Sequence, residues 1–344
     1  MSKIKPSKGA PYARILGVGG YRPARVVPNE VILETIDSSD EWIRSRSGIQ
    51  TRHWANDEET VSAMSLEAAG KALAAAGIDA AQVGAVVVST VSHFEQTPAV
   101  ATEIAAKLGT DRAAAFDISA GCAGFGYALT LAKGMVVEGS AEYVVVIGVE
   151  RLSDLTDLED RATAFLFGDG AGAVVVGPSE EPGIGPTVWG SEGDKAGVIK
   201  QTVSWNDYRV GAELSSLPLD EAGRVKFPAI TQEGQTVFRW AVFEMAKVAQ
   251  QALDAAGIGP DELDVFIPHQ ANERIIDSLF KTLKLPETVT VARDVRTTGN
   301  TSAASIPLAM DRLMETGEAK SGDTALVIGF GAGLAYAATV VTLP

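Results

Sequence analysis

Two pairs of segments repeat along this chain at nearly the same offset. Residues 73–79 and 253–259 each predict the end of an alanine-rich helix that stops at a glycine, followed by a polar link and an apolar strand. Residues 140–148 match residues 321–329, and the offset changes only from 180 to 181. Two well-separated matches at almost one offset predict that the chain folds as two structurally related halves.

Each half alternates apolar strands with amphipathic helices, a pattern that predicts a layered α/β fold. The strands are almost continuously apolar, so we expect both faces of each strand to be buried. The expected boundary gives an N-terminal half of residues 1–178 and a C-terminal half of residues 179–344. Residues 178–228 break the pattern. We expect them to form the connection and an excursion, with a mobile loop from Ala212 to Val225.

The composition limits the expected partners and location. The net charge of −15 disfavours nucleic acid and anionic membrane surfaces, although an acidic partner could still dock on a local basic patch. The single cysteine cannot form an internal disulfide bond. The N-terminal residues lack the apolar core of a signal peptide, and no apolar run approaches the roughly 18 residues of a membrane span. We therefore expect a cytoplasmic protein that binds neither nucleic acid nor membranes.

The only cysteine, Cys122, lies between a short apolar run and a segment with helical spacing. Residues 113–118 predict a buried strand and residues 127–137 predict a helix, which places Cys122 in a strand-to-helix turn. Unpaired backbone N–H groups and the helix dipole favour a thiolate there, and the neighbouring glycines allow a substrate to approach. The alternative is that Cys122 is a small buried hydrophobic residue.

Two residues of the second half extend this candidate site. His269 directly follows the apolar run 265–268, at the carboxyl end of a predicted strand, where ligands bind in α/β sheets. Asn300 lies in a turn that opens a helix and resembles the Cys122 turn, so pseudo-symmetric halves would bring all three residues together. Cysteine, histidine and asparagine suit nucleophilic acyl transfer, in which neutral side chains donate to an oxyanion. Alternatively, His269 is a core histidine and Asn300 caps a helix.

Two glycine-rich turns lie near this candidate site in the sequence. Residues 329–333 predict a tight turn between two apolar strands, which would bring a backbone N–H close to a substrate carbonyl. Residues 167–172 are only loosely similar to a dinucleotide-binding fingerprint. Because this run lies between two predicted strands and does not open a helix, we reject a dinucleotide site.

Five segments together form a specific combination: residues 39–43 (SDEWI), 119–125 (SAGCAGF), 167–172 (FGDGAG), 268–272 (PHQAN) and 299–305 (GNTSAAS). Through them the chain closely resembles the β-ketoacyl-acyl-carrier-protein synthase III family over essentially its whole length. The resemblance implies the thiolase fold, in which two pseudo-duplicated halves form a five-layered αβαβα architecture. It also implies a homodimer.

The same resemblance implies the chemistry. Cys122 would take the acyl group of an acyl-CoA starter, and malonyl-acyl-carrier protein would then lose carbon dioxide while His269 and Asn300 stabilise the enolate. The carbanion would attack the Cys122 thioester and give 3-oxoacyl-acyl-carrier protein. This decarboxylative Claisen condensation initiates type II fatty acid biosynthesis. Acyl-CoA and the acyl carrier protein are then substrates and partners, and we expect no cofactor and no metal.

The resemblance also assigns binding residues. The N–H groups of Cys122 and Ala332 would form the oxyanion hole. The family usually has glycine at Ala332, and a backbone donor survives that change. Trp42 and Arg161 would sandwich the CoA adenine, with Arg46 near the nucleotide phosphates.

Three cations, Arg239, Arg274 and Lys281, fall where the family docks its carrier protein. Both the carrier and this chain are acidic, so a local basic patch has to overcome net repulsion. The alternative for each cation is an ordinary solvated surface charge.

One position, Thr97, departs from the pattern of some family members. They carry phenylalanine there, which crosses the dimer interface and floors the acyl pocket of the partner. The smaller threonine predicts a wider pocket that accepts branched or longer starters than acetyl.

Several other activities are alternatives to this interpretation. A starter-unit ketosynthase of a secondary-metabolite (polyketide) pathway would keep the same three residues. A non-catalytic thiolase-fold scaffold is a more distant alternative because it would be expected to lose Cys122. A degradative thiolase needs a second cysteine, an elongating ketosynthase needs a second histidine in place of Asn300, and a papain-like hydrolase lacks the duplication.

Overall fold

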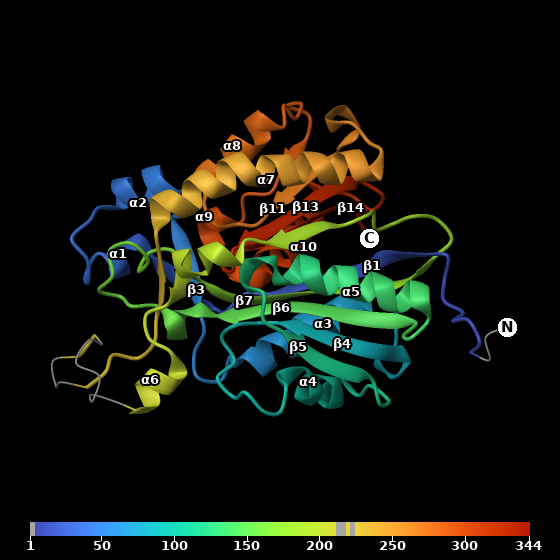
Figure 1. Ribbon diagram of the computed structural model, residues 1–344, viewed down its shortest axis with the longest axis horizontal. Helices are drawn as coiled ribbons and strands as arrows, with labels where there is room; N and C mark the ends of the chain where they lie inside the picture. Colours follow the sequence, from blue (N-terminus) through green and yellow to red (C-terminus); the bar gives the residue numbers. More distant parts are fainter. Residues whose placement is uncertain (1–3, 211–217, 221–223) are drawn as a thin grey trace.

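The computed structural model describes residues 4–210, 218–220 and 224–344 (Figure 1). Most of the loop expected between Ala212 and Val225 lies outside these residues. Two five-stranded sheets dominate the fold. The first runs in the order β1-β7-β6-β4-β5 and contains β1 (Tyr12–Tyr21), β4 (Val83–Ser89), β5 (Ala114–Ile118), β6 (Tyr143–Arg151) and β7 (Asp169–Ser179).

The second sheet repeats the arrangement of the first. It runs in the order β12-β11-β13-β14-β8 and contains β8 (Val188–Ser191), β11 (Val265–Pro268), β12 (Thr290–Val291), β13 (Thr324–Gly331) and β14 (Ala335–Thr342). In each sheet three neighbouring strands are parallel, and the next two pair antiparallel. The repeated sequence segments fall on β4 and β11 and on β6 and β13, which hold equivalent places. The predicted duplication is therefore confirmed in the topology.

Helices separate and cover the two sheets. The longer ones are α3 (Val61–Ala76), α4 (Val100–Leu108), α5 (Gly124–Glu138), α7 (Gly234–Ala256), α8 (Glu273–Thr282) and α10 (Ser305–Thr316). One apolar cluster joins α3 and α4 to the first sheet, another joins α7 and α8 to the second, and a third joins α5 and α10 to both sheets. Figure 1 shows the resulting five layers, with α7 and α8 at one side and α4 at the other. The predicted α/β thiolase-like architecture is confirmed.

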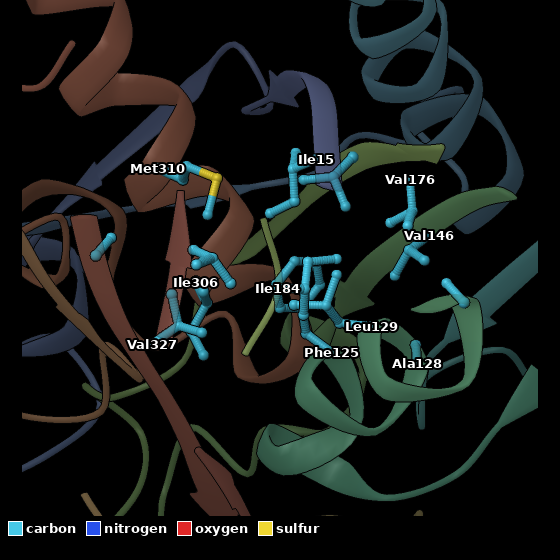
Figure 2. Close-up of a cluster of buried hydrophobic side chains, with 14 of the residues drawn as sticks. Ile15, Phe125, Ala128, Leu129, Val146, Val176, Ile184, Ile306, Met310 and Val327 are labelled. Carbon is cyan, nitrogen blue, oxygen red and sulfur yellow. The ribbon is translucent and has the colours of Figure 1, made fainter. Parts of the chain in front are cut away.

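The middle layer is apolar on nearly all sides. Figure 2 shows Phe125 of α5 and Ile306 of α10 between strands of both sheets, with Ile15 of β1 and Val327 of β13 among their neighbours. Phe125 and Ile15 have no exposed surface, and Ile306 is 1% exposed. Because α5 and α10 each bury an apolar face between the sheets, they hold fixed positions there. The turns that precede them are fixed as a result.

The helix ends of the two halves are also equivalent. α3 and α7 end at Gly77 and Gly257, whose φ values of 67° and 74° lie in the left-handed region that glycine adopts without strain. The helix ends predicted at these two glycines are confirmed.

The connection between the halves contains short regular elements. Residues 178–228, expected to form the connection and an excursion, contain β8, β9 (Ile199–Gln201) and α6 (Trp205–Val210) among the described residues. β8 has only four residues and alternates half-buried with exposed positions, so its sequence lacks the apolar run of a central strand. The strands of the first sheet end at Ser179 and those of the second begin at Val188, while the division into two domains at 178/179 stays a prediction.

The remaining elements are short. They are β2 (Arg25–Pro28), α1 (Asn29–Ile32), α2 (Asp40–Ser47), β3 (Thr51–Trp54), β10 (Ile230–Gln232), α9 (Val295–Thr298) and the 3-10 turns η1 (Ala80–Gln82), η2 (Gly121–Ala123), η3 (Leu152–Leu155), η4 (Gly193–Val198), η5 (Pro260–Glu262) and η6 (Ser302–Ala304). Within the described ranges, no helix combines the length and apolar character that crossing a membrane requires.

Candidate active site

Cys122 lies in η2, between β5 and α5, as its sequence context predicts. The turn is left-handed at Gly121, where φ is 51°. The end of β13 approaches the turn closely, because a Cβ atom built on Gly331 would lie 2.9 Å from the Sγ atom of Cys122. Glycine at position 331 therefore leaves the space that the Cys122 side chain fills.

Asn300 lies just before η6, the equivalent turn of the second half. Its backbone N–H donates to the carbonyl of Leu166 at 2.8 Å, and its carbonyl accepts from the Gly168 N–H at 3.0 Å. Its side-chain Oδ1 accepts from the Ser302 N–H at 2.9 Å. With the main chain and the oxygen held, the NH2 group of the buried Asn300 side chain is the remaining donor.

His269 directly follows β11 and is 2% exposed. Its Nδ1 lies 2.7 Å from the Oγ atom of Ser305, and its ring meets Phe330 edge-on with centroids 5.5 Å apart. Burial lowers the pKa of His269 to about 3, so the imidazole is neutral at physiological pH. When the Ser305 hydroxyl donates to Nδ1, Nε2 carries the proton and can donate to a substrate.

These residues meet in one cavity of about 600 Å³, whose walls include Cys122, His269, Asn300 and Ala332. The structure therefore brings together the three residues that the sequence predicts as catalytic. The cavity also has an apolar part, formed by side chains that include Leu152, Leu155, Ile199, Ile230 and Phe330. A site that combines a nucleophile, two neutral donors and an apolar recess suits transfer of an acyl chain.

The expected preference of the turn for a thiolate is not what the structure shows. Burial raises the pKa of the Cys122 thiol to about 12, and the charge of Glu150 acts in the same direction. Hydrogen bonding from Ser302 lowers this pKa but does not offset the burial. Cys122 is therefore a neutral thiol in the free site.

Ala332 lies in the turn between β13 and β14, as predicted. A Cβ atom built on Gly121 would lie 3.6 Å from the backbone N atom of Ala332, so this turn lies directly beside the Cys122 turn. The two N–H groups expected to form an oxyanion hole thus come from adjacent segments.

The three residues expected to bind CoA also lie together, outside the cavity wall. The Cζ atoms of Arg161 and Arg46 lie 5.1 and 6.0 Å from the centre of the Trp42 ring, and Phe165 meets that ring edge-on. An adenine between Trp42 and Arg161 needs about 7 Å, twice the usual contact distance. The pair is therefore closed in this structure and has to open by about 2 Å to admit a base.

Thr97 is exposed and does not line the cavity of its own chain, whereas its neighbours His93, Glu95 and Gln96 do. Its predicted role in the acyl pocket of a partner therefore stays a prediction. The sequence of the exposed segment that carries Thr97 continues into α4.

The predicted carrier-docking cations lie on two packed helices. Arg239 is exposed on α7, and Arg274 and Lys281 are exposed two helical turns apart on α8. The Cζ atom of Arg274 lies 5.0 Å from the centre of the Phe238 ring. The residues beside them in sequence, Val237 and Ile275, line the cavity, so this basic surface borders the site.

Sequence reasoning missed three residues that contact the site residues: Glu150, Ser302 and Ser305. Ser302 has a φ of 47°, in the left-handed region, at the position equivalent to Gly121. Aligning the two halves at the 181-residue offset would have shown a serine where the first half has glycine. Glu150 is the one acidic residue in the apolar run of β6, a signal that was also present in the sequence.

Within the described ranges, no group of three or more His, Cys, Asp or Glu side chains is placed to hold a metal ion.

Comparisons with known proteins give the family of this chain. Family models described as 3-oxoacyl-[acyl-carrier-protein] synthase III match residues 116–193 and, for the C-terminal part of that protein, residues 253–343. A β-ketoacyl-[acyl-carrier-protein] synthase III of Streptomyces coelicolor is 86% identical, and the match covers 100% of both chains. A mycobacterial synthase III of Mycobacterium marinum is 52% identical, covering 100% of this chain and 99% of its own.

Solved structures give the same answer. The priming β-ketosynthase of a polyketide biosynthetic pathway is 46% identical, with a TM-score of 0.93 over 100% of this chain and 99% of its own. The 3-oxoacyl-[acyl-carrier-protein] synthase III of Aquifex aeolicus is 37% identical, with a TM-score of 0.84 over 96% and 99%. The chain belongs to the β-ketoacyl-acyl-carrier-protein synthase III family, and it is an acyltransferase-type condensing enzyme.

Proposed function

We propose that this protein condenses an acyl-CoA starter with malonyl-acyl-carrier protein to give 3-oxoacyl-acyl-carrier protein, the step that begins fatty acid synthesis. The observation that carries the proposal is the single cavity that contains Cys122, His269 and Asn300. The Streptomyces coelicolor relative that is 86% identical is a β-ketoacyl-[acyl-carrier-protein] synthase III, which supports the same activity.

In the first half-reaction, the sulfur of Cys122 attacks the thioester carbonyl of acyl-CoA. The N–H groups of Cys122 and Ala332 donate to the oxyanion that forms, and neutral backbone donors in a buried site stabilise such charge strongly. The new C–S bond on Cys122 replaces the C–S bond to CoA, which leaves as the thiol after taking up a proton.

In the second half-reaction, malonyl-acyl-carrier protein enters the same cavity. The bond between its carboxylate and α carbon breaks, carbon dioxide leaves, and the electron pair forms an enolate on the thioester. His269 Nε2–H and the Asn300 NH2 group donate to the enolate oxygen. The α carbon then attacks the acyl group on Cys122 and forms the new C–C bond as the C–S bond to Cys122 breaks. The sulfur leaves as a thiolate and takes up a proton from solvent, which restores the thiol.

The surroundings of the cavity supply the binding sites. Trp42, Arg46 and Arg161 bind the nucleotide end of CoA after the Trp42–Arg161 pair opens. The exposed cations Arg239, Arg274 and Lys281 dock the acidic carrier protein at the edge of the cavity. The reaction uses no metal and no cofactor beyond these substrates, and the protein works as a cytoplasmic homodimer without nucleic acid or membrane partners.

Thr97 sets the starter specificity across the dimer interface. Thr97 is exposed on its own chain, and a threonine there would remove bulk from the partner's pocket relative to phenylalanine. We expect Thr97→Phe to lower kcat/KM for isobutyryl-CoA about 10-fold or more relative to acetyl-CoA. Thr102→Phe, on the exposed side of α4, is the matched control and leaves the ratio unchanged. An unchanged ratio in Thr97→Phe contradicts this role.

Intact-protein mass spectrometry tests the proposed activity directly. The protein is mixed with a panel of acyl-CoA thioesters and then with malonyl-acyl-carrier protein. The proposal requires an acyl adduct that Cys122→Ser lacks and that malonyl-acyl-carrier protein discharges. Absence of an adduct with every acyl-CoA refutes it.

A second candidate function is the starter-unit step of a polyketide pathway, because the priming β-ketosynthase with a TM-score of 0.93 belongs to such a pathway. The two functions share the half-reactions and differ in the carrier protein. Comparing kcat/KM for malonyl groups on a fatty acid carrier and on a polyketide carrier distinguishes them.

A further inference from the structure

A buried carboxylate lies behind the cavity wall. Glu150 is the second-last residue of β6 and has no exposed surface. Its Oε2 accepts hydrogen bonds from the hydroxyls of Thr90 and Ser92, at 3.3 and 2.7 Å, and from the N–H of Val91 at 3.1 Å. Its Oε1 is buried and has no hydrogen-bond partner in the described part of the chain. A buried acceptor left open in this way is costly unless it serves a purpose.

Ser302 connects this carboxylate to the nucleophile. The Ser302 side chain lowers the pKa of both Cys122 and Glu150, so its hydroxyl lies near both groups. Ser302 and Cys122 line the cavity, whereas Glu150 does not. The serine therefore stands between the thiol and the carboxylate.

The backbone of Ser302 supports a use for its hydroxyl. Its φ of 47° is unfavourable for a residue with a side chain, and the equivalent position of the first half has glycine, Gly121, with a φ of 51°. Strain of this kind is retained mainly where a side chain has a function.

The duplication explains how Glu150 reaches this turn. At the 181-residue offset its equivalent is Gly331, which packs against Cys122 in η2. The end of β6 packs against η6 in the same way, since a Cβ atom built on Gly148 would lie 2.1 Å from the carbonyl oxygen of Ala303. Glu150 thus faces the η6 turn from the place where the other half has only a glycine.

We propose that Glu150 accepts the thiol proton of Cys122 through the Ser302 hydroxyl during acylation, an inference that rests on the proposed function. The Cys122 sulfur forms its bond to the acyl carbon as the S–H proton passes to Ser302 and the Ser302 proton passes to Glu150. The CoA sulfur leaves with the electron pair of the broken C–S bond. The same path returns the proton to CoA, so the carboxylate is restored.

Glu150 is a better proton acceptor than the alternative, His269. Burial lowers the pKa of His269 to about 3, whereas burial raises the pKa of Glu150 to about 7. A general base works best when its pKa lies near the working pH.

Few charged or titratable groups lie near Glu150 in the described part of the chain. Cys122 is the ionisable group in the cavity whose pKa Glu150 raises. The donors from the β4 side are neutral, and the neighbouring Arg151 directs its guanidinium to Asp154 and Asp57.

The test measures the two half-reactions separately in Glu150→Gln and Ser302→Gly. Glutamine keeps the shape of Glu150, and glycine suits the backbone of residue 302 while it removes the hydroxyl. We expect both variants to acylate about 100-fold more slowly in single-turnover mass spectrometry with acyl-CoA. Wild-type acylation rises with pH through about 7 as Glu150 ionises, and this limb is absent in Glu150→Gln. Decarboxylation of malonyl-acyl-carrier protein stays within about 2-fold of wild type.

Asp169→Asn is the matched control. Burial raises the pKa of Asp169 to about 6, but this carboxyl binds Ala55 and Ser153, away from Cys122. We expect its acylation to keep the limb near pH 7. Wild-type acylation rates in Glu150→Gln overturn the inference, and so does an equal loss of both half-reactions, which would show a structural role. A wild-type protein that no acyl-CoA acylates overturns the proposed function as well.

Discussion

The turn before α5 and the turn before α10 share one backbone but differ in their side chains. Gly121 and Ser302 have φ values of 51° and 47°, and each turn continues through a 3-10 segment into a buried helix. The first turn carries the thiol of Cys122, and its equivalent in the second is Ala303. Asn300 precedes the second turn, where the first half has Ser119.

The strand ends beside these turns differ in a matched way. In the first half, Ser89 packs so closely on α5 that a Cβ atom on Gly124 would lie 1.8 Å from its Oγ. In the second half, His269 takes the place of Ser89 and binds Ser305, which takes the place of Gly124. The two halves thus share one backbone arrangement and differ at a few equivalent positions beside the site. In the proposed mechanism, the first half holds the acyl group and the second half stabilises the enolate.

The largest expected effect follows from moving the nucleophile between the halves. Cys122→Ala lowers the rate of condensation by about 10⁴-fold or more, because the covalent intermediate cannot form. Adding Ala303→Cys, at the equivalent position, does not restore the rate, because that turn faces Glu150 and lacks the space that Gly331 provides. Turnover with acyl-CoA and malonyl-acyl-carrier protein measures both. Recovery to within 10-fold of wild type would show that the two turns are interchangeable.

A smaller effect is expected when the space beside Cys122 is filled. In Gly331→Ala, the new Cβ would lie 2.8 Å from the Cβ and 2.9 Å from the Sγ of Cys122, so the sulfur has to move. Such a displacement lowers the acylation rate about 100-fold. Gly197→Ala, where a Cβ meets no atom within 4 Å, is the control and acylates normally. Equal rates in the two variants would refute the close fit.

The hydroxyl that distinguishes α10 from α5 has a more moderate role. Ser305→Ala leaves the buried Nδ1 of His269 without its 2.7 Å partner and lets the ring turn. We expect decarboxylation of malonyl-acyl-carrier protein to fall about 10-fold and acylation of Cys122 to stay unchanged. A parallel fall in both half-reactions would contradict this division.

The pH dependence of decarboxylation checks the state of His269. A buried histidine with a pKa of about 3 is already neutral at pH 6.5, where a free histidine titrates. Decarboxylation by the wild-type protein therefore shows no acid limb near pH 6.5, and activity that depends on neutral His269 is lost only as the pH falls toward 3. A half-maximal rate near pH 6.5 that disappears in His269→Gln would contradict the neutral, buried state.

The smallest effect concerns the basic surface on α7 and α8. Arg274→Ala removes one rim charge, and we expect KM for malonyl-acyl-carrier protein to rise about 5-fold while acylation by acyl-CoA is unchanged. Lys107→Ala on α4, at the opposite outer layer, is the control. An equal change in the two variants would place the carrier elsewhere.

Much of this arrangement could be predicted because it depends on short segments of sequence. The helix ends at Gly77 and Gly257 follow from glycine, and they are confirmed. The strand ahead of Cys122 follows from its apolar run and is also confirmed, but its predicted burial is wrong, because β5 is the edge strand of its sheet and none of its residues is buried in this chain. The edge strand β8 could not be predicted, because a half-exposed strand of four residues has too few apolar residues to form a pattern.

The ionisation of Cys122 could not be predicted from its turn alone. Helix dipoles and backbone donors are local, but burial comes from distant segments such as the end of β13. The single acidic residue in the apolar run of β6 marks Glu150 as unusual, but its place beside the site could not be predicted, because its neighbours Thr90 and Ser302 lie about 60 and 150 residues away in sequence. Tertiary packing determines both the pKa of Cys122 and the surroundings of Glu150.

The division of labour between the halves is tested most directly by measuring both half-reactions in Cys122→Ala and His269→Ala. The structure predicts that Cys122→Ala still releases carbon dioxide from malonyl-acyl-carrier protein but forms no acyl adduct. His269→Ala is acylated by acyl-CoA yet releases carbon dioxide at least about 100-fold more slowly. Loss of both half-reactions in both variants would contradict the division and show that the site works as one inseparable unit.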